Sequence, residues 1–244
     1  MKRLTLLLLT IFSLTAYGQD TLKSKPTRDF KRILIGVNFS PDYCFRTLKN
    51  NDGSSSSTFV MNSRNDREIA KFGYTAGLNL CFNFTEHIGL ETGIQYSNKG
   101  YQTKMQDLFW GQPDPSLPTK AKFVYSDLYI DIPLKANFTF GKRKFKFCSS
   151  AGLTTNIFIK ETSTSIQEFS NGDTKKQTSK TIFSYKRVDL SPTVSIGLDY
   201  KINNRMNLKV EPTFRYGVLK IIDTPVTGYL WNAGLNISYY FGLR

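Results

Sequence analysis

Residues 72–84 read Phe72-Gly73-Tyr74-Thr75-Ala76-Gly77-Leu78-Asn79-Leu80-Cys81-Phe82-Asn83-Phe84. Apolar and aromatic side chains occupy every even position, and small or polar ones occupy every odd position. This period of two is that of a β-strand, because the 3.6-residue period of a helix would scatter both classes around its circumference. Residues 229–241 show the same alternation with the apolar side chains at odd positions. Both segments are therefore predicted to be strands.

A less regular alternation predicts six more strands, at residues 33–45, 88–99, 124–140, 145–160, 188–202 and 206–218. Tight turns are expected at 85–86, 141–144 and 203–205, and longer polar loops at 47–71, 102–122, 161–187 and 219–228. An up-and-down meander places all the tight turns and both chain ends on one side, as in outer-membrane barrels with periplasmic turns. The sequence thus predicts an all-β fold, an eight-stranded antiparallel up-and-down transmembrane β-barrel.

Alternation alone leaves open whether the apolar face meets lipid or fills a soluble, lipocalin-like barrel. The polar face is built of Gly, Asn, Thr and Ser, which are small enough for a narrow lumen. About 12 residues at about 3.3 Å each, tilted by roughly 40°, span ~30 Å and so cover an outer-membrane apolar band. Aromatic side chains flank an aliphatic middle, as two membrane interfaces require. The predicted aromatic girdles contain Phe72, Tyr74, Phe82, Phe84, Tyr229, Trp231, Tyr239 and Phe241.

The N-terminus has the three parts of a secretory signal peptide. A basic head, an apolar stretch at residues 4–14 and the small residues Ala16 and Gly18 predict cleavage after Gly18, in preference to a buried helix. Residues 19–32 are then a basic periplasmic segment, and 33–244 form the barrel. No later stretch approaches the ~18 uninterrupted apolar residues of a membrane-spanning helix. We expect an outer-membrane protein with both termini in the periplasm.

Catalytic and metal-binding motifs are missing from the sequence. The three cysteines, Cys44, Cys81 and Cys148, form no C-x-x-C pair and are expected to pack as small, semi-polar residues. The single histidine, His87, follows the turn at 85–86 and is expected at the periplasmic rim, away from any outer-leaflet lipid substrate. Hydrolase, zinc-protease, phosphate-loop and dinucleotide motifs do not occur. We therefore expect no enzyme, no cofactor, no metal site and no small-molecule substrate.

Charged residues on the polar face of the strands are expected inside the barrel: Glu91, Asp131, Lys135, Asp199, Lys209, Glu211 and Arg215. Glu91 and Lys135 are at similar heights on adjacent strands, and so are Asp199 and Lys209. Unpaired charges in so narrow a lumen would cost several kcal/mol each, so we expect a paired network. Its role is either a polar plug that fixes strand register or a path for protons or ions.

The formal net charge is +14. The clusters expected to contact anionic lipid or an acidic partner protein are Lys142, Arg143 and Lys144 in a turn, and Lys175, Lys176 and Lys180 in a long loop. A merely solvated set of charges is the alternative. Nucleic acid is not expected as a partner of an exported barrel.

Four prolines fall within predicted strands, where we expect local bulges: Pro41, Pro133, Pro192 and Pro212.

The segment Tyr129-Ile130-Asp131-Ile132-Pro133-Leu134-Lys135 and the ending Tyr239-Tyr240-Phe241-Gly242-Leu243-Arg244 resemble the PorT-like outer-membrane β-barrels. The resemblance extends over essentially the whole mature chain. It implies an outer-membrane location and, as for the namesake of that family, a part in type IX protein secretion. Two functions stay open: an accessory of secretion or envelope assembly acting through periplasmic and loop contacts, or an adhesin-like barrel acting through its long loops.

Overall fold

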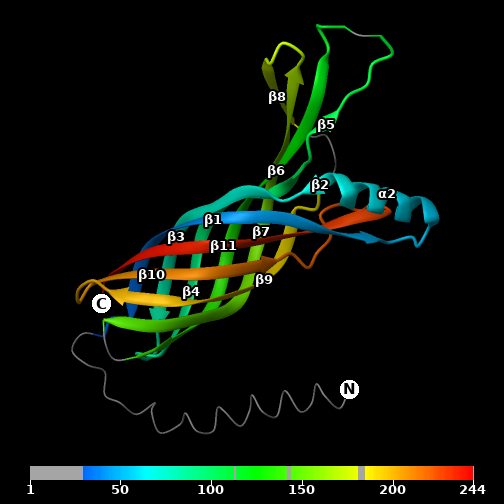
Figure 1. Ribbon diagram of the computed structural model, residues 1–244. Helices are drawn as coiled ribbons and strands as arrows, with labels where there is room; N and C mark the ends of the chain where they lie inside the picture. Colours follow the sequence, from blue (N-terminus) through cyan, green and yellow to red (C-terminus); the bar gives the residue numbers. More distant parts are fainter. Residues whose placement is uncertain (1–29, 113, 142–143, 181–184, 244) are drawn as a thin grey trace.

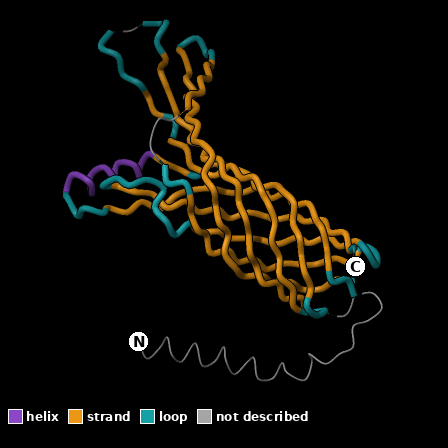
Figure 2. The backbone as a smooth tube through the Cα atoms, turned by 180° about the vertical axis from the view of Figure 1, so that it is seen from behind, coloured by secondary structure: helices purple, strands orange, loops and turns teal. Residues whose placement is uncertain are grey.

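The computed structural model describes residues 30–112, 114–141, 144–180 and 185–243. The predicted signal peptide, together with Lys142 and Arg143, lies outside these residues. Eight long strands pair antiparallel with their neighbours in the sequence, and the last pairs with the first, so the predicted barrel is confirmed (Figures 1 and 2). These strands are β1 (Ile33–Asn50), β3 (Lys71–Asn83), β4 (Ile88–Thr103), β6 (Pro118–Phe140), β7 (Phe145–Phe169), β9 (Val188–Lys201), β10 (Met206–Tyr216) and β11 (Val226–Gly242).

The two ends of the barrel differ in their connections. Short turns join β3 to β4, β6 to β7 and β9 to β10, and all three lie at the end where β1 begins and β11 stops, with Leu34 opposite Gly242. We call this the short-turn end. The opposite end, called the loop end, carries the longer connections (Figure 1). The alternation of connection lengths in the sequence predicted this arrangement.

The long connections are folded to a greater extent than the sequence indicated. They contain α2 (Ser55–Arg67), β2 (Glu68–Ile69), β5 (Gln106–Asp107) and β8 (Thr174–Lys180). Strands β6 and β7 have 23 and 25 residues, against 13 in β3, and they continue past the barrel as a two-stranded ribbon flanked by β5 and β8. We call β5, β8 and the outer parts of β6 and β7 that pair with them, around residues 120–121 and 162–168, the projecting sheet (Figure 1). Its residues face water on both sides, so the hydrophobic alternation that reveals a barrel strand is absent from them.

The helix α2 begins at a clear capping residue. The Ser54 hydroxyl accepts a hydrogen bond from the Ser57 amide at 3.1 Å, which satisfies one of the free amides of the first turn. Arg64 and Arg67 lie in the last turn, where the helix dipole favours positive charge. Its few apolar side chains explain why the sequence pattern did not reveal it. Among the described residues, no helix has the length and apolar character needed to cross a membrane.

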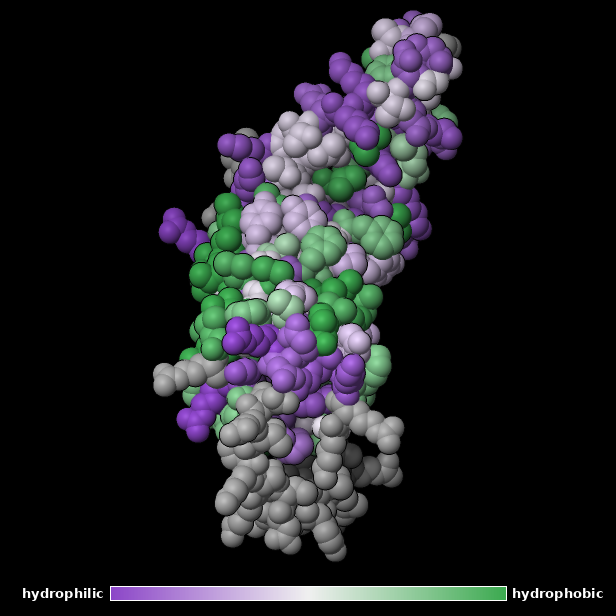
Figure 3. Space-filling model, turned by 90° about the vertical axis from the view of Figure 1, so that its left-hand side faces the viewer, coloured by the Kyte–Doolittle hydropathy of each residue, from purple (hydrophilic) through white to green (hydrophobic). Residues whose placement is uncertain are grey.

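The side chains alternate between the outside and the lumen as predicted. On β3, Leu78 is 60% exposed on the outside and Asn79 is 2% exposed inside. On the face seen in Figure 3, apolar side chains form a belt between two polar regions. The core of this molecule is therefore polar and enclosed, and its hydrophobic surface faces outward, the reverse of a soluble protein.

The bulges expected at the four prolines are wrong. Residues 131–134 on β6 pair in unbroken register with 153–156 on β7, across Pro133. Pro41, Pro192 and Pro212 also keep the register of the strand they pair with. A proline lacks one donor toward one neighbour only, so the ladder on its other side continues. The register shift inside the barrel lies elsewhere: Leu128 pairs with Lys160 but Tyr129 pairs with Phe158, which leaves Ile159 as an extra residue of β7.

Candidate functional site: the lumen and the loop end

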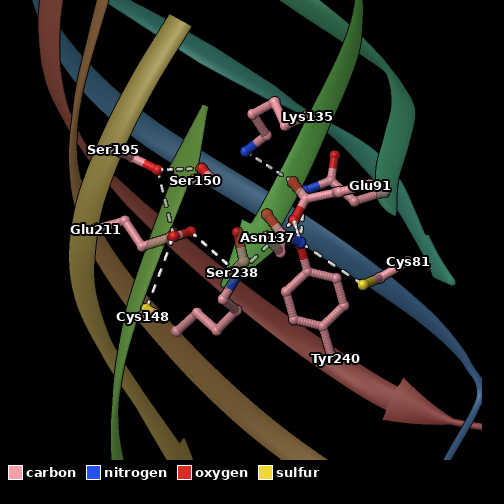
Figure 4. Close-up of polar contacts among 12 residues, drawn as sticks. Cys81, Glu91, Lys135, Asn137, Cys148, Ser150, Ser195, Glu211, Ser238 and Tyr240 are labelled. Carbon is pink, nitrogen blue, oxygen red and sulfur yellow. Dashed lines mark hydrogen bonds and ion pairs between the residues drawn. The ribbon is translucent and has the colours of Figure 1, made fainter. Parts of the chain in front are cut away.

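The lumen near the short-turn end holds a network of ion pairs centred on Glu91 of β4. Lys135 of β6 lies 2.8 Å from one carboxylate oxygen of Glu91, and Asn137 donates to the other at 2.8 Å (Figure 4). The Lys209 ammonium of β10 lies 3.7 Å from Glu91 and 3.5 Å from Glu211. All of these side chains are buried. The network thus links three strands, β4, β6 and β10, across the lumen.

Neutral groups complete this network. Ser195 donates to Glu211 at 3.3 Å, and the Cys148 thiol lies 3.7 Å from the same carboxylate (Figure 4). The ring of Tyr240 is 1% exposed and lies 5.7 Å from the Lys209 ammonium, in a cation–π arrangement. Asn79 donates to the Tyr240 hydroxyl at 3.3 Å. These side chains pack across the lumen in its short-turn half.

A second set of polar contacts fills the half nearer the loop end. Asp42 of β1 accepts hydrogen bonds from Thr75 at 2.6 Å and from Asn232 at 2.9 Å, and Arg215 of β10 lies 3.7 Å from it. Lys99 of β4 lies 3.0 Å from Asp131. In each half of the lumen, positively charged side chains therefore lie next to negatively charged ones.

The structure places all seven charged residues named from the sequence inside the barrel, each at most 9% exposed. The sequence placed two oppositely charged pairs at similar heights, and only one of them forms an ion pair in the structure. Glu91 and Lys135 form an ion pair, whereas Asp199 accepts hydrogen bonds from Asn207, at 2.9 and 3.2 Å, and its register partner Lys209 extends to Glu91 and Glu211. Four of the seven charges, Glu91, Lys135, Lys209 and Glu211, therefore form one network, whereas Asp131, Asp199 and Arg215 have other partners.

Several buried charges were missed by the sequence analysis. Asp42, Lys99 and Asp127 have the inward parity of their strands, so counting along the strands would have found them. Glu161 differs, because the extra residue Ile159 reverses the parity of β7. Before it, even positions such as Asn156 face inward; after it, the odd-numbered Glu161 does. No sequence signal announces this reversal.

An arginine–glutamate cluster closes the loop end. Glu68 of β2 accepts a hydrogen bond from Arg46 of β1 at 2.7 Å and another from Arg64 of α2 at 2.6 Å. Arg64 also donates to the hydroxyl of Tyr101 at 3.0 Å, and the guanidinium of Arg46 lies 5.7 Å from that ring. The cluster anchors α2 to the barrel strands. Nearby, burial raises the pKa of the Tyr185 phenol, which stays protonated and hydrogen-bonds Glu161.

The outermost strand, β8, is the most exposed and most basic element of the loop end. All seven of its residues are exposed, and among the described residues it pairs with β7 alone. Lys176 and Lys180 lie on one face of β8 and Lys175 on the other, since side chains alternate along a strand. The turn residue Lys144, at the opposite end of the barrel, is also exposed.

The comparisons with known proteins agree with this architecture. Residues 18–223 match the model of a family described as the outer membrane protein beta-barrel domain. The chain belongs to this family. No curated protein matches the sequence. The match is to the broad domain, so membership of the PorT-like group stays a prediction.

Solved structures that resemble this outer-membrane barrel include three with low sequence identity. Neisserial surface protein A has a TM-score of 0.47 and 11% identity, with 86% of this chain and 97% of that chain covered. OprG from Pseudomonas aeruginosa has a TM-score of 0.43 and 13% identity, covering 87% and 97%. Ail of Yersinia pestis has a TM-score of 0.35 and 10% identity, covering 86% and 99%.

As a member of this family the barrel lies in the outer-membrane bilayer, and its surface has the matching chemistry. Phe72 and Tyr74 are exposed on the outside near the loop end, and Phe82 and Phe84 near the short-turn end. On β11, Tyr239 and Phe241 are exposed near the short-turn end, whereas Tyr229 and Trp231 are half-buried near the loop end. Tyr43 and Phe72 meet edge to face with ring centroids 6.0 Å apart. Rings at both ends of an apolar belt are suited to the two interfaces of a bilayer.

The remaining residues considered for chemistry occupy structural positions. His87 lies at the short-turn end, with Nδ1 2.9 Å from the carbonyl oxygen of Thr139. Cys44, Cys81 and Cys148 are free and buried, on β1, β3 and β7. In the parts of the chain that the structure describes, no three metal-ligating side chains come together.

Proposed function

We propose that this outer-membrane barrel is a non-enzymatic, non-conducting protein that binds other proteins through its projecting sheet, with that sheet outside the cell and both termini in the periplasm. The observation that carries the proposal is the outer edge of β8. It offers seven exposed residues on a strand whose second edge has no partner among the described residues.

The edge of β8 favours one kind of partner. An unpaired edge presents amide and carbonyl groups that an extended segment of another protein can pair with. Lys175, Lys176 and Lys180 oppose pairing between two copies of β8, because like charges would face each other, and they attract an acidic segment. We therefore propose an extended acidic segment as the feature recognised.

The filled lumen supports the absence of conduction. Eight strands leave an interior just wide enough for side chains. Five buried side chains contact one another at one height of this lumen: Glu91, Lys135, Lys209, Glu211 and Tyr240. An ion path would have to displace this network, which leaves the structural role of a polar plug as the better account.

The position of the histidine supports a non-enzymatic role. Ser–His–Asp hydrolysis needs the histidine within hydrogen-bond reach of its serine. His87, in the turn between β3 and β4 at the short-turn end, contacts the Thr139 carbonyl, whereas an outer-leaflet substrate would enter at the loop end. We expect His87→Ala to leave the phenotype unchanged.

Charge reversal on β8 tests the proposal. A strain lacking the gene is complemented with wild type, with Lys175, Lys176 and Lys180 all changed to Glu, or with the exposed lysines Lys49, Lys104 and Lys186 changed to Glu as a charge-matched control. We expect the β8 variant to reach the outer membrane at normal levels yet fail to restore the phenotype, and the control to restore it. Full complementation by the β8 variant would contradict the proposal.

A secretion accessory is the second candidate, and two observations favour it. One is the resemblance of residues 129–135 and of the C-terminal residues to the PorT-like barrels, which implies type IX secretion. The other is a cavity of about 130 Å³ at the short-turn end, lined by the basic residues Lys31, Lys146, Lys201 and Arg205 among others. A broad loss of secreted proteins after gene deletion supports this role; a normal secreted proteome with lost surface binding supports the adhesin-like one.

A further inference from the structure

The loop end of the barrel contains a cavity of about 300 Å³, which is in the range of small-ligand sites. Its wall combines elements far apart in the sequence: Arg46, Leu48, Arg64, Glu68, Tyr101, Tyr125, Asp127, Glu161, Tyr185, Ile221, Ile222, Thr224, Val226 and Gly228. Apolar, aromatic and acidic side chains all contribute to this wall, and two of its acids, Asp127 and Glu161, lie on neighbouring strands. The projecting sheet described above is a different surface, so this site is independent of the proposed function.

Among the charged side chains of this cavity wall, Asp127 differs from the others in its contacts. Glu68 is held by Arg46 and Arg64, and Glu161 is bonded by Tyr185. Asp127 is 2% exposed, and its buried Oδ1 has no hydrogen-bond partner among the described residues. Leaving a buried carboxyl group without a hydrogen-bond partner is costly in either protonation state, so its retention in the wall of a cavity needs an explanation.

The lysines nearest to Asp127 are engaged elsewhere. Lys71 donates to Asn98 and to Ser126, both at 2.7 Å. Lys99 lies 3.0 Å from Asp131 and donates to Asn156 at 2.6 Å. Of these two lysines, neither is therefore bonded directly to Asp127.

Asp127 also has a second acid beside it. Its register partner across β6 and β7 is Glu161, which the extra residue Ile159 turns inward. Two neighbouring carboxylates disfavour each other's ionised form, and a cation between or beside them relieves this repulsion.

We propose that this cavity binds a small ligand that carries a protonated amine on an apolar body. The ammonium group lies against Asp127 and Glu161. The apolar body packs against Ile221, Ile222 and Val226, and the tyrosine rings around the acids add cation–π attraction.

Other ligand classes fit less well. An anion would meet the unpartnered Asp127, while the two arginines that could bind it are already bonded to Glu68. A metal ion would lack ligands, because no group of three His, Cys, Asp or Glu side chains forms within the described residues. An uncharged apolar molecule would leave Asp127 without a hydrogen-bond partner.

Calorimetry on the full-length barrel tests the proposal. The protein is placed in phosphatidylcholine nanodiscs, whose headgroups carry no primary amine, and titrated with phenethylamine at neutral pH. Phenethyl alcohol and phenylacetate have the same apolar body without the positive charge. We expect phenethylamine to bind at least tenfold more tightly than either. Equal affinity for phenethyl alcohol would overturn the proposal.

Variants assign the binding to this site. Asp127→Asn should weaken phenethylamine binding at least tenfold without lowering the melting temperature, because it removes an unpartnered buried carboxylate. Asp107→Asn, the same change at an exposed position of β5, should leave affinity unchanged. Ile222→Trp fills the cavity and should abolish binding, which keeps the test decisive if the Asp127 variant folds poorly. Unchanged affinity in Asp127→Asn or Ile222→Trp would overturn the proposal.

The source of the amine is distinguished by lipid composition. Nanodiscs containing phosphatidylethanolamine offer an amine headgroup at the membrane surface. A lower apparent affinity for phenethylamine there would assign the amine to the lipid headgroup. An unchanged affinity would assign it to a free molecule.

Discussion

Lys135 and Glu91 form a buried ion pair across β6 and β4, with the ammonium nitrogen 2.8 Å from a carboxylate oxygen and side chains 5% and 0% exposed. Breaking a buried pair by removing one partner is far more costly than replacing both, because the remaining charge stays buried. We expect Lys135→Met to destabilise the barrel by about 3–5 kcal/mol. Lys135→Met combined with Glu91→Gln should recover part of this loss.

Urea unfolding in lipid vesicles measures the three free energies. Because Lys209 also lies 3.7 Å from Glu91, the recovery in the double variant should be incomplete. Additive losses in the double variant would show that the two residues act independently and would contradict the network.

The outward parity of β3 is tested at Leu78, which is 60% exposed in the middle of the apolar belt. Arginine at the bilayer midplane on a lipid-facing position costs about 2–4 kcal/mol. Leu78→Arg should therefore impair insertion in a bilayer refolding titration. Asn79→Ala, one residue along and facing the lumen, should still insert, at a cost of about 1 kcal/mol for its lost bonds with Gln95 and Tyr240. Normal insertion of Leu78→Arg would mean that the parity is wrong.

Gly36 of β1 gives room to the ring of Tyr240 on β11. A Cβ atom added at Gly36 would lie 2.6 Å from Cδ1 of Tyr240 and 2.8 Å from the carbonyl oxygen of Tyr239. Gly36→Ala should destabilise the barrel by about 1–3 kcal/mol through overpacking. Gly111→Ala is the matched control, since nothing lies within 4 Å of its added Cβ. Equal thermal unfolding of both variants would rule out this close contact.

A filled lumen predicts an electrically silent protein. In planar-bilayer recordings of the purified barrel we expect no steady single-channel steps, because the side chains around Lys209 and Tyr240 occupy the pore. Large, steady steps would refute the plugged barrel and revive the ion path.

The proposed orientation predicts which tags antibodies reach on intact cells. A tag inserted at Ser55, at the start of α2, should be labelled, whereas one at Asn204, in the turn between β9 and β10, should be labelled only after the outer membrane is opened. The reverse pattern would invert the barrel.

The barrel strands could be predicted because one of their faces meets lipid, which forces an apolar residue at every second position. This rule holds for β3 and β11 and fails outside the bilayer. Strand β8 and the outer part of β7 face water on both sides, and their residues show no hydrophobic alternation.

The candidate site was only partly predictable for related reasons. Parity was sufficient for Glu91 and Lys135, whose heights follow from counting residues from the turns. It could not predict that Lys209 would extend to the carboxylates of other strands, because long side chains choose partners by distance and not by register. The inward position of Glu161 could not be predicted, because no sequence feature indicates that Ile159 is an extra residue in β7.

The three unpaired thiols have a practical consequence. Cys44, Cys81 and Cys148 are at most 4% exposed, and they lie on three different strands. An alkylating reagent can reach them only when the strands separate, so covalent labelling with a maleimide counts unfolded molecules in a mixed population. Because β1 and β3 are adjacent whereas β7 lies elsewhere in the ring, the order in which the three sites become labelled reports where the barrel first opens. The native sequence therefore contains its own probes of local opening, with no engineered cysteine required.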